Sequence, residues 1–400
     1  MKRLIILLLN FSIVAAGFSQ SWIQKSDYPG VACDDGTSFT IGNKAYCGTG
    51  MTPWFSTTTD FYSFDLVSET WTNSTPLPTG MERQYAVGLS DQSFGYLFGG
   101  TGNGIFYNDL WKFDPATAIW TQLSSMPDSG RSGSTGFIIN DTIYIVGGTK
   151  TMGGAIPDVW AYSINDDSWE QKNDLPYTIW TAKSTSVNGK GYLTFGMTDN
   201  GSFPENLLEY IPQTDSWIDL PPYPETGHSH GSMVSSGNFL LTMGGRDSLG
   251  VYSKYLHRYD INNQTWQQLS AIPDSDRKGG MVFSKDEKLY YTTGITATNT
   301  RLKQTWKCTD ALISNQESEI SKWKVFPNPV QDKLRIEIEE SFSFEKINLV
   351  LTGIQGKVWM EQAISGQKST IDMSALPQGL YFASLKGSGH FGTIKLLKTH

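Results

Sequence analysis

The chain has 400 residues, of which 18% are charged and 13% are aromatic, and it contains 40 glycines. Its net charge of -8 argues against the basic surface with which proteins bind nucleic acid or anionic membranes. We therefore predict an all-β exported protein without a nucleic-acid partner, and the length leaves room for more than one domain.

The first 19 residues have the pattern of a secretory signal peptide. Lys2 and Arg3 supply positive charge, residues 4–16 form a short apolar core, and small residues follow. The apolar core is too short to favour a membrane-spanning helix, and no later stretch approaches that length. We predict cleavage after Ser19 or after Gly17, no transmembrane span, and a secreted or surface-displayed protein.

A tryptophan followed seven residues later by proline recurs six times, with a period of 48 to 49 residues, at Trp22, Trp71, Trp120, Trp169, Trp217 and Trp266. After each lies a strand-like run that ends on a glycine, at Gly50, Gly100, Gly148, Gly196, Gly245 and Gly294. Glycine at the end of a strand permits a positive φ and a close approach of two backbones. We interpret the tryptophans as apolar fillers between neighbouring repeats.

This pattern resembles the Kelch repeat, in which about 50 residues form one four-stranded blade of a β-propeller. The resemblance covers residues 20–311 and implies a six-bladed Kelch-like propeller. No seventh tryptophan follows Gly294 at the expected spacing. We therefore predict that residues 21–27 provide the outer strand of the last blade, beside residues 275–310, and that this closure hides sheet edges.

The C-terminal part has a different strand pattern. Residues 312–323 are polar and are predicted to be a linker, whereas residues 324–400 suggest a small β-sandwich. The motifs at residues 325–329, 356–358 and 371–381 resemble the type A C-terminal sorting domain of the bacterial type IX secretion system. This resemblance implies the type IX secretion machinery of Bacteroidetes-like bacteria as a partner, and surface attachment or release after passage through the outer membrane.

Six equivalent positions lie 17 residues before the terminal glycines, namely Cys33, Arg83, Arg131, Ile179, His228 and Arg277. In the Kelch-like arrangement they gather on one face, around the mouth of the central channel. One interpretation is that the three arginines and the histidine bind a carboxylate or sulfate, which suits the fork of the guanidinium group. The alternative is that each arginine bonds neighbouring backbone carbonyls and braces its own blade.

The loops after the glycines lie on the same face and carry aromatic and basic residues. We predict a ligand-binding site that comprises Trp54, Arg83, Arg131, Trp180, His228, His230, Arg246 and Arg277. Aromatic side chains in exposed loops suit contacts with sugars or proteins, although they would also serve to cover the blade tops. His228 and His230 would share one face of a strand, but no third ligand accompanies them, so we predict no metal and no cofactor.

Three cysteines in an exported chain allow at most one disulfide. A hairpin that turns at Gly42 would hold Cys33 and Cys47 too far apart in register to bond, so we predict buried free thiols.

The sequence offers three functions. No nucleophile elbow, P-loop or paired-carboxylate motif is present, and no catalytic residue is assigned. We favour an exported module that binds a glycan or a protein. The alternatives are a sugar-acid mutarotase or epimerase that acts on sialic acid, as some exported Kelch-like propellers do, and a purely structural surface protein.

Overall fold

The computed structural model describes residues 22–151, 153–286, 288–308, 323–338, 347–353, 357–364, 366–386 and 390–399. These residues form two compact units, one that ends at residue 308 and one that begins at residue 323. The described part of the chain is built from strands, and it contains no helix with the length and apolar character of a membrane span. The predicted signal peptide and nearly all of the predicted linker lie outside the described residues.

The larger unit consists of six four-stranded antiparallel sheets, the blades of a propeller. Their inner strands are β2 (Thr37–Ile41), β6 (Val87–Ser90), β13 (Thr135–Ile139), β18 (Lys183–Val187), β22 (Ser232–Ser236) and β26 (Met281–Lys285). The second strands are β3 (Lys44–Gly48), β7 (Gly95–Phe98), β14 (Thr142–Val146), β19 (Lys190–Thr194), β23 (Phe239–Met243) and β27 (Lys288–Thr292). The third strands are β4 (Phe61–Asp65), β10 (Leu110–Asp114), β16 (Val159–Ser163), β20 (Leu207–Ile211), β24 (Leu256–Asp260) and β28 (Thr305–Cys308). The outer strands are β5 (Thr70–Asn73), β11 (Ile119–Leu123), β17 (Ser168–Lys172), β21 (Ser216–Leu220), β25 (Thr265–Gln268) and β1 (Trp22–Lys25).

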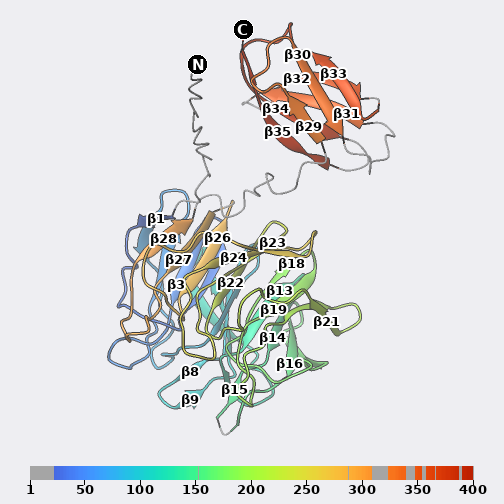
Figure 1. Ribbon diagram of the computed structural model, residues 1–400. Helices are drawn as coiled ribbons and strands as arrows, with labels where there is room; N and C mark the ends of the chain where they lie inside the picture. The colour runs from blue at the N-terminus through green and yellow to red at the C-terminus, as the bar shows by residue number, and fades with distance from the viewer. Residues whose placement is uncertain are drawn as a thin grey trace, which may run out of the picture. The chain divides into compact units, whose positions relative to one another are not determined.

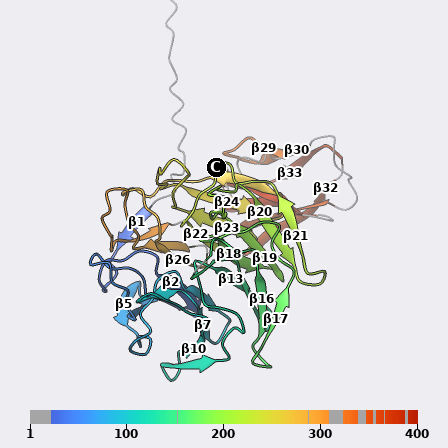
Figure 2. The same cartoon turned by 90° about the horizontal axis from the view of Figure 1, so that it is seen from below.

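The inner strands form the wall of a central channel. Each of them lies beside the inner strands of both neighbouring blades, in the order β2, β6, β13, β18, β22, β26 and back to β2. Figure 2 shows several of these strands arranged around the centre of the propeller. The fold is therefore the six-bladed Kelch-like propeller that the repeats predict, and we number its blades one to six in the order of the inner strands.

The N-terminal strand completes blade six, as predicted. Strand β1 pairs antiparallel with β28, from Trp22 opposite Cys308 to Lys25 opposite Thr305. The indole nitrogen of Trp22 also donates a hydrogen bond of 3.1 Å to the carbonyl oxygen of Ser270, at the end of blade five. The ring is thus closed by the first described residues of the chain.

The repeated tryptophans pack between blades, which confirms their predicted structural role. The Trp120 ring lies 6.2 Å from Phe39 and 5.2 Å from Phe61, which both belong to the preceding blade. Its indole nitrogen donates a hydrogen bond of 3.1 Å to the carbonyl oxygen of Thr75, just after the outer strand of that blade. Trp71, Trp169 and Trp266 make the equivalent bond to Ser26, Ser124 and Pro221. Together with Trp22, these tryptophans join apolar packing to a hydrogen bond across five of the six blade boundaries, whereas the indole nitrogen of Trp217 has no hydrogen-bond partner among the described residues.

The terminal glycines have the backbone conformation that the sequence predicts. Their φ angles lie between +93° and +105° in all six blades. At Gly100 an added Cβ would lie 2.6 Å from the carbonyl oxygen of Gln84, which is closer than a carbon atom can approach. Any other residue would therefore combine an unfavourable φ with a steric clash.

The smaller unit is a β-sandwich with one apolar core. One sheet contains β29 (Trp323–Phe326), β30 (Lys333–Ile338) and β33 (Lys368–Asp372), and the other contains β31 (Ile347–Gly353), β32 (Val358–Ile364), β34 (Gly379–Lys386) and β35 (His390–Lys398). The core lies between the sheets and includes Leu334, Ile336, Leu349 and Leu351. Trp323 belongs to this core and is 1% exposed, so the predicted linker, which included this residue, extended too far.

The cysteines are buried, as predicted. Cys33 and Cys47 are free thiols inside blade one, and Cys308 is buried in β28. Burial, as the largest cause, raises the pKa of the Cys33 thiol to about 12. A thiol with such a pKa is a poor nucleophile, so Cys33 acts as a small apolar side chain.

Candidate functional site

The six equivalent positions before the inner strands form a ring of contacts between blades. The backbone N–H of each terminal glycine donates a hydrogen bond to the carbonyl oxygen of the equivalent residue in the next blade. The pairs are Gly50 with Arg83, Gly100 with Arg131, Gly148 with Ile179, Gly196 with His228, Gly245 with Arg277 and Gly294 with Cys33, at 2.7 to 3.0 Å. The spacing of 17 residues therefore identifies positions that are equivalent in space as well as in sequence.

The side chain of Arg83 is fully buried and braces its own blade. It makes a bidentate ion pair with Asp109, with nitrogen to oxygen distances of 2.7 and 2.9 Å, and donates a further bond of 3.0 Å to the carbonyl oxygen of Gly99. Its guanidinium carbon lies 4.0 Å from the centre of the Tyr107 ring. These contacts agree with the alternative interpretation, in which the arginine braces its own blade and does not bind a ligand.

Arg131 and Arg277 are also fully buried and have similar partners. Arg277 donates to the carbonyl oxygens of Ser275 and Thr293 and pairs with Asp274 at 2.7 Å. Arg131 pairs with Asp128 at 2.5 Å and with Asp158 at 3.5 Å. Arg83 and Arg277 are therefore braced by their own blades, as the alternative interpretation predicts, whereas the Nε and Nη1 atoms of Arg131 are buried and have no hydrogen-bond partner among the described residues.

The brace can be tested at Arg83. We expect Arg83→Met to lower the free energy of unfolding by about 3 to 5 kcal/mol, because it leaves the buried Asp109 carboxylate without its cation. Adding Asp109→Asn to the same variant is expected to recover part of the loss. Denaturant unfolding of the two variants measures both effects. An unchanged stability in Arg83→Met would instead favour the ligand-binding interpretation.

A second ring lies two residues further along the chain, where the channel begins. Its members are Asp35, Tyr85, Gly133, Thr181, His230 and Gly279, and all six have φ between +54° and +65°. Backbone hydrogen bonds run around this ring, from Asp35 to Gly279, Tyr85 to Asp35, Gly133 to Tyr85, Thr181 to Gly133 and Gly279 to His230. We call these six residues the mouth ring.

Four members of the mouth ring are not glycine, although their backbone conformation favours glycine. For Tyr85 and Thr181 a positive φ is an outlier that costs on the order of 1–3 kcal/mol. Strain of this kind is found where a side chain serves a function. The mouth ring is therefore a better candidate site than the arginines. Its members lie two residues after the six equivalent positions, so the same repeat spacing locates them in the sequence.

Charged groups of both signs gather at the mouth ring. Asp34 and Arg301 form a buried ion pair at 2.5 Å, with side chains that are 5% and 6% exposed. Burial, and after it the adjacent Asp35, raise the pKa of Asp34 to about 7, while Arg301 acts in the opposite direction. Burial lowers the pKa of Lys183, which Asp35 opposes. The mouth therefore holds the carboxyl groups of Asp34 and Asp35 together with the guanidinium group of Arg301 and the amine of Lys183.

The structure separates the two predicted histidines. The rings of His228, Phe195 and Tyr223 are in contact where blade four meets blade five. The His230 ring instead lies 5.7 Å from Tyr85 and 5.4 Å from Trp180, at the mouth ring. The prediction that both histidines share a strand face was wrong, because they precede β22 and His230 has a positive φ. Among the described residues, no group of three potential ligands is placed to hold a metal ion.

Short hairpins surround the mouth ring. They follow the terminal glycines, and pairs such as Met51 with Thr57, Arg246 with Tyr252 and Ile295 with Arg301 close them. In Figure 1, β8 (Thr101–Gly102), β9 (Ile105–Phe106) and β15 (Thr149–Lys150), which belong to two of these hairpins, lie at the same end of the propeller. We call this set of hairpins the crown.

The crown exposes apolar side chains beside the polar mouth. Trp54 is 74% exposed and Phe55 is 69% exposed, and Leu249 and Val251 are exposed in the hairpin of blade five. The guanidinium carbon of Arg301 lies 5.2 Å from the centre of the Phe55 ring. Because Arg301 also pairs with Asp34, the exposed aromatic residues are contiguous with the mouth ring.

Two predicted residues, Trp180 and Arg246, lie where the crown meets the mouth ring. Trp180 bridges to Met197 and packs against His230, and Arg246 bridges to Ser229. The Arg246 Nε atom is buried and has no hydrogen-bond partner among the described residues. The structure therefore brings Trp54, Trp180, His230 and Arg246 to one face, whereas it buries Arg83, Arg131, His228 and Arg277 within the blades.

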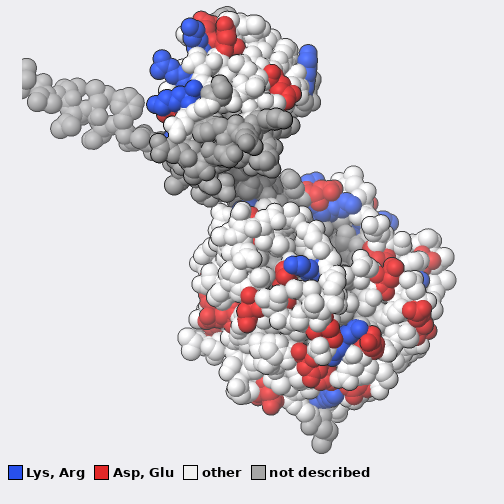
Figure 3. All heavy atoms as spheres, turned by 90° about the vertical axis from the view of Figure 1, so that its right-hand side faces the viewer, with Lys and Arg blue, Asp and Glu red and all other residues white. Residues whose placement is uncertain are grey.

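The six blades and the equivalent positions that form the mouth ring define a six-bladed β-propeller of the Kelch type. The model of the KLHDC2/KLHL20/DRC7 Kelch-repeats domain matches residues 35–227 and 128–294, and the chain belongs to this Kelch-repeat family. The smaller unit matches the secretion system C-terminal sorting domain over residues 324–399, which indicates export to the cell surface or the medium. Acidic and basic side chains are interspersed on the propeller face seen in Figure 3.

The relatives of the propeller have diverse names. Kelch-like protein 23 of Homo sapiens is 23% identical over 265 residues, which are 65% of this chain and 46% of that protein. The chain thus spans about half the length of the curated relatives that it matches first. N-acetylneuraminate epimerase of Escherichia coli O139:H28 is 24% identical over 71% of this chain and 74% of the relative. The solved structure of YjhT has a TM-score of 0.61 at 19% identity and covers 70% of this chain and 95% of its own, which shows the fold alone.

Proposed function

We propose that the protein is an extracellular binding module whose crown and mouth ring recognise a glycan or a protein. The observation that carries this proposal is the continuity of exposed aromatic rings with a buried ionic mouth. Phe55 contacts Arg301, and Arg301 pairs with Asp34. A ligand bound there would meet flat apolar surface and charged hydrogen-bonding groups together, which is a frequent combination in binding sites.

The buried Nε–H group of Arg246, which has no hydrogen-bond acceptor among the described residues, also supports ligand binding on this face. A buried N–H group without an acceptor costs about 1–3 kcal/mol, and an acceptor on a ligand would remove that cost. The guanidinium groups of Arg246 and Arg301 are hydrogen-bond donors and the carboxyl group of Asp34 is an acceptor, and this combination suits the hydroxyl groups of a sugar. We therefore place a glycan first and a protein second as the expected partner.

We expect the double change Trp54→Ala and Phe55→Ala to weaken glycan binding by at least about tenfold and to leave the fold intact, because both side chains are largely exposed. A glycan array with the full chain identifies the ligand, and titration calorimetry measures the loss. Val67→Ala is the control, since Val67 is 75% exposed in the turn between β4 and β5, outside the crown. Unchanged binding in the double variant would contradict this site.

The second candidate is a sugar-acid mutarotase or epimerase. It is favoured by relatives that carry the name N-acetylneuraminate epimerase and match most of the propeller. Burial, and after it Asp35, raise the pKa of Asp34 to about 7, so its carboxyl group is of the kind that exchanges protons near neutral pH. Nuclear magnetic resonance of N-acetylneuraminate in the presence of the full chain distinguishes turnover from binding, because only an enzyme accelerates the interconversion of anomers.

A further inference from the structure

The sequence contains an Asn-Gly pair at three places, residues 103–104, 188–189 and 200–201. The backbone nitrogen of the glycine can attack the side-chain carbonyl carbon of the asparagine, and glycine hinders the attack least because it has no Cβ. The attack forms a five-membered succinimide ring, which water opens to an acidic residue. Each pair is therefore a candidate site for deamidation without an enzyme, and the fold decides which of them reacts.

The pair at Asn200 is held by its own hairpin. The N–H group of Gly201 donates a hydrogen bond of 3.0 Å to the carbonyl oxygen of Thr198, so the attacking nitrogen is occupied. The side-chain oxygen of Asn200 accepts hydrogen bonds from the Thr198 hydroxyl group and from the N–H group of Ser202. Both reacting groups of this pair are therefore fixed in the folded protein.

The pair at Asn188 lies in a tight turn. Asn188 and Gly189 form the two-residue loop between β18 and β19 and have φ of +51° and +75°. These values are typical of a type I′ turn, in which the glycine nitrogen lies on the opposite side of the asparagine backbone from the side chain. The turn must therefore open before the reaction can take place.

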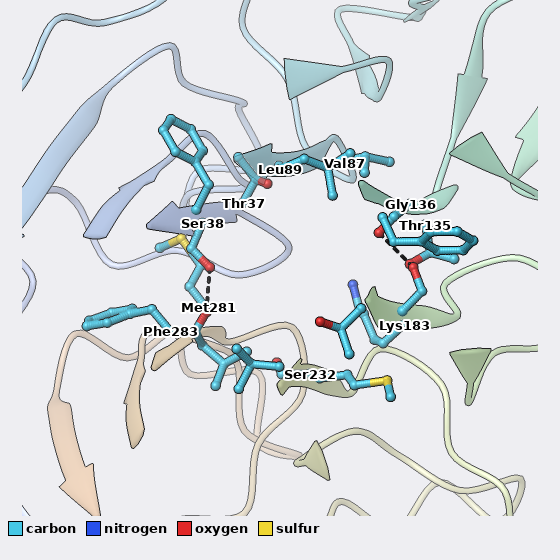
Figure 4. A pocket seen from close by; sticks show the side chains of 18 of the residues that line it. Thr37, Ser38, Val87, Leu89, Thr135, Gly136, Lys183, Ser232, Met281 and Phe283 are labelled. Carbon is cyan, nitrogen blue, oxygen red and sulfur yellow. Dashed lines mark hydrogen bonds between the residues drawn. The ribbon is translucent and has the colours of Figure 1, made fainter. Parts of the chain in front are cut away.

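Several contacts oppose the opening of this turn. Strands β18 and β19 pair along five residues, and the side-chain nitrogen of Asn188 donates a hydrogen bond of 2.9 Å to Asn238 in the next blade. Strand β18 also lines the channel, where Figure 4 shows Lys183 among side chains of other blades. The hydroxyl groups of Ser184 and Ser186 donate to carbonyl oxygens of blade three at 2.8 and 2.6 Å. The turn at Asn188 is therefore firmly held.

The same turn at Asn103 has less support. Asn103 and Gly104 have φ of +51° and +78° and join β8 to β9, two strands of two residues each that form a sheet of their own. Such a short hairpin has little stability by itself. The side chain of Asn103 is exposed, and its one hydrogen bond among the described residues is a contact of 3.3 Å to Glu82. The Gly104 N–H group donates no hydrogen bond in the described part of the chain, so the attacking nitrogen is free whenever the turn opens.

We propose that Asn103 is the site of spontaneous deamidation in the exported protein, with water as the only other reactant. The Gly104 nitrogen loses its proton to the solvent and bonds to Cγ of Asn103. The Cγ–Nδ2 bond breaks, and the side-chain nitrogen takes up a proton and leaves as ammonia. Water then adds to one of the two carbonyl carbons of the ring, and the bond from that carbon to the ring nitrogen breaks. The product is an aspartyl or an isoaspartyl residue, and either one carries a new carboxylate.

The new carboxylate changes the crown. Asn103 lies in the crown hairpin of blade two, and the Glu82 carboxylate that accepts its N–H bond would instead face a like charge. An isoaspartyl residue also adds one carbon atom to the backbone, so the turn no longer matches the pairing of β8 with β9. We therefore expect modified chains to lose the closed form of this hairpin, without a change in the blades.

This inference goes beyond the proposed function, because the reaction needs no ligand and takes place in a different hairpin from Trp54 and Phe55. The double change Trp54→Ala and Phe55→Ala is expected to leave the rate at Asn103 unchanged. A failure of the glycan-binding proposal and a failure of this inference are therefore separate results.

The test compares the three pairs within one protein. The full chain is kept in mildly alkaline buffer, once folded and once in guanidinium chloride, and peptide mass spectrometry follows the conversion of each asparagine. In denaturant we expect similar rates at all three pairs, because each asparagine precedes glycine. In the folded protein we expect Asn103 to react at least about tenfold faster than Asn188 and Asn200, because the rate follows the population of the opened turn.

Gly104→Asn is the matched variant, since asparagine tolerates the left-handed backbone of the turn but has a Cβ that hinders the attack. We expect this variant to convert Asn103 about tenfold more slowly than the unaltered protein does. Equal rates at the three pairs in the folded protein, a faster reaction at Asn188 or Asn200, or an Asn103 that stays intact while the denatured chain reacts would each overturn the inference. An unchanged rate in Gly104→Asn would overturn the route through the succinimide ring.

Discussion

Deletion of residues 22–30 is expected to lower the free energy of unfolding of the propeller by about 5 kcal/mol or more. The deletion removes β1, which pairs along its whole length with β28, and the Tyr28 side chain, which is 1% exposed. It also removes the carbonyl oxygen of Ser26 that accepts the indole N–H of Trp71. Blade six would then have three strands, with β28 as an unpaired edge.

The comparator for this deletion is a chain that begins at Trp22. Denaturant unfolding is expected to give a lower midpoint for the deleted chain, and a synthetic peptide of residues 22–31 should raise it in a concentration-dependent way. The same midpoint in both chains would show that β1 contributes little to closure. Failure of the peptide alone would show that the strand has to be covalently attached.

The second large effect is expected on acidification, through three buried histidines. Burial, as the largest cause, lowers the pKa of His228 and His257 to about 4 and that of His230 to about 3. These values lie below the pKa of an unfolded histidine, about 6.5, so the unfolded chain takes up protons first as the pH falls. Stability is therefore fully present above pH 6.5 or so and is lost between that pH and about 4.

At pH 5 each histidine is expected to remove about 2 kcal/mol of stability relative to neutral pH. Asp34 acts in the opposite sense, since its raised pKa makes the folded state bind a proton before the unfolded chain does. We therefore expect a net loss of about 3 kcal/mol, which unfolding curves at pH 7 and pH 5 measure. His257→Gln, which keeps a polar group near Tyr223, should reduce the net loss from about 3 to about 1 kcal/mol, and an unchanged loss would contradict the role of His257.

The propeller could be predicted from the sequence because the repeated glycines and tryptophans occupy positions that the backbone and the packing of every blade require. The terminal glycines have positive φ, and the tryptophans pack between blades at the expected positions. In the sandwich, β30 is recognisable from the sequence because its apolar residues alternate, and Leu334, Ile336 and Ile338 all face the core. Strand β33 carries no such pattern, because only Ile371 of its five residues is buried.

The candidate site was harder to predict for physical reasons. An arginine at a repeated position offers the same chemistry to a ligand and to a carbonyl of its own blade, and only burial distinguishes the two. Arg83 and Arg277 are 0% exposed and bond to their own blades. Tyr85 carries no recognisable motif, since its importance depends on a backbone ring that exists only after folding.

The pairing of β1 with β28 has a mechanical consequence for an exported protein with a C-terminal sorting domain. Tension on the C-terminal side of the propeller enters at Cys308, the last residue of β28. Strand β28 lies between β27 and β1, so hydrogen bonds on both sides of the strand share the force. Without β1, a single ladder would have to resist the same pull, and blade six would peel away from the ring at a lower force.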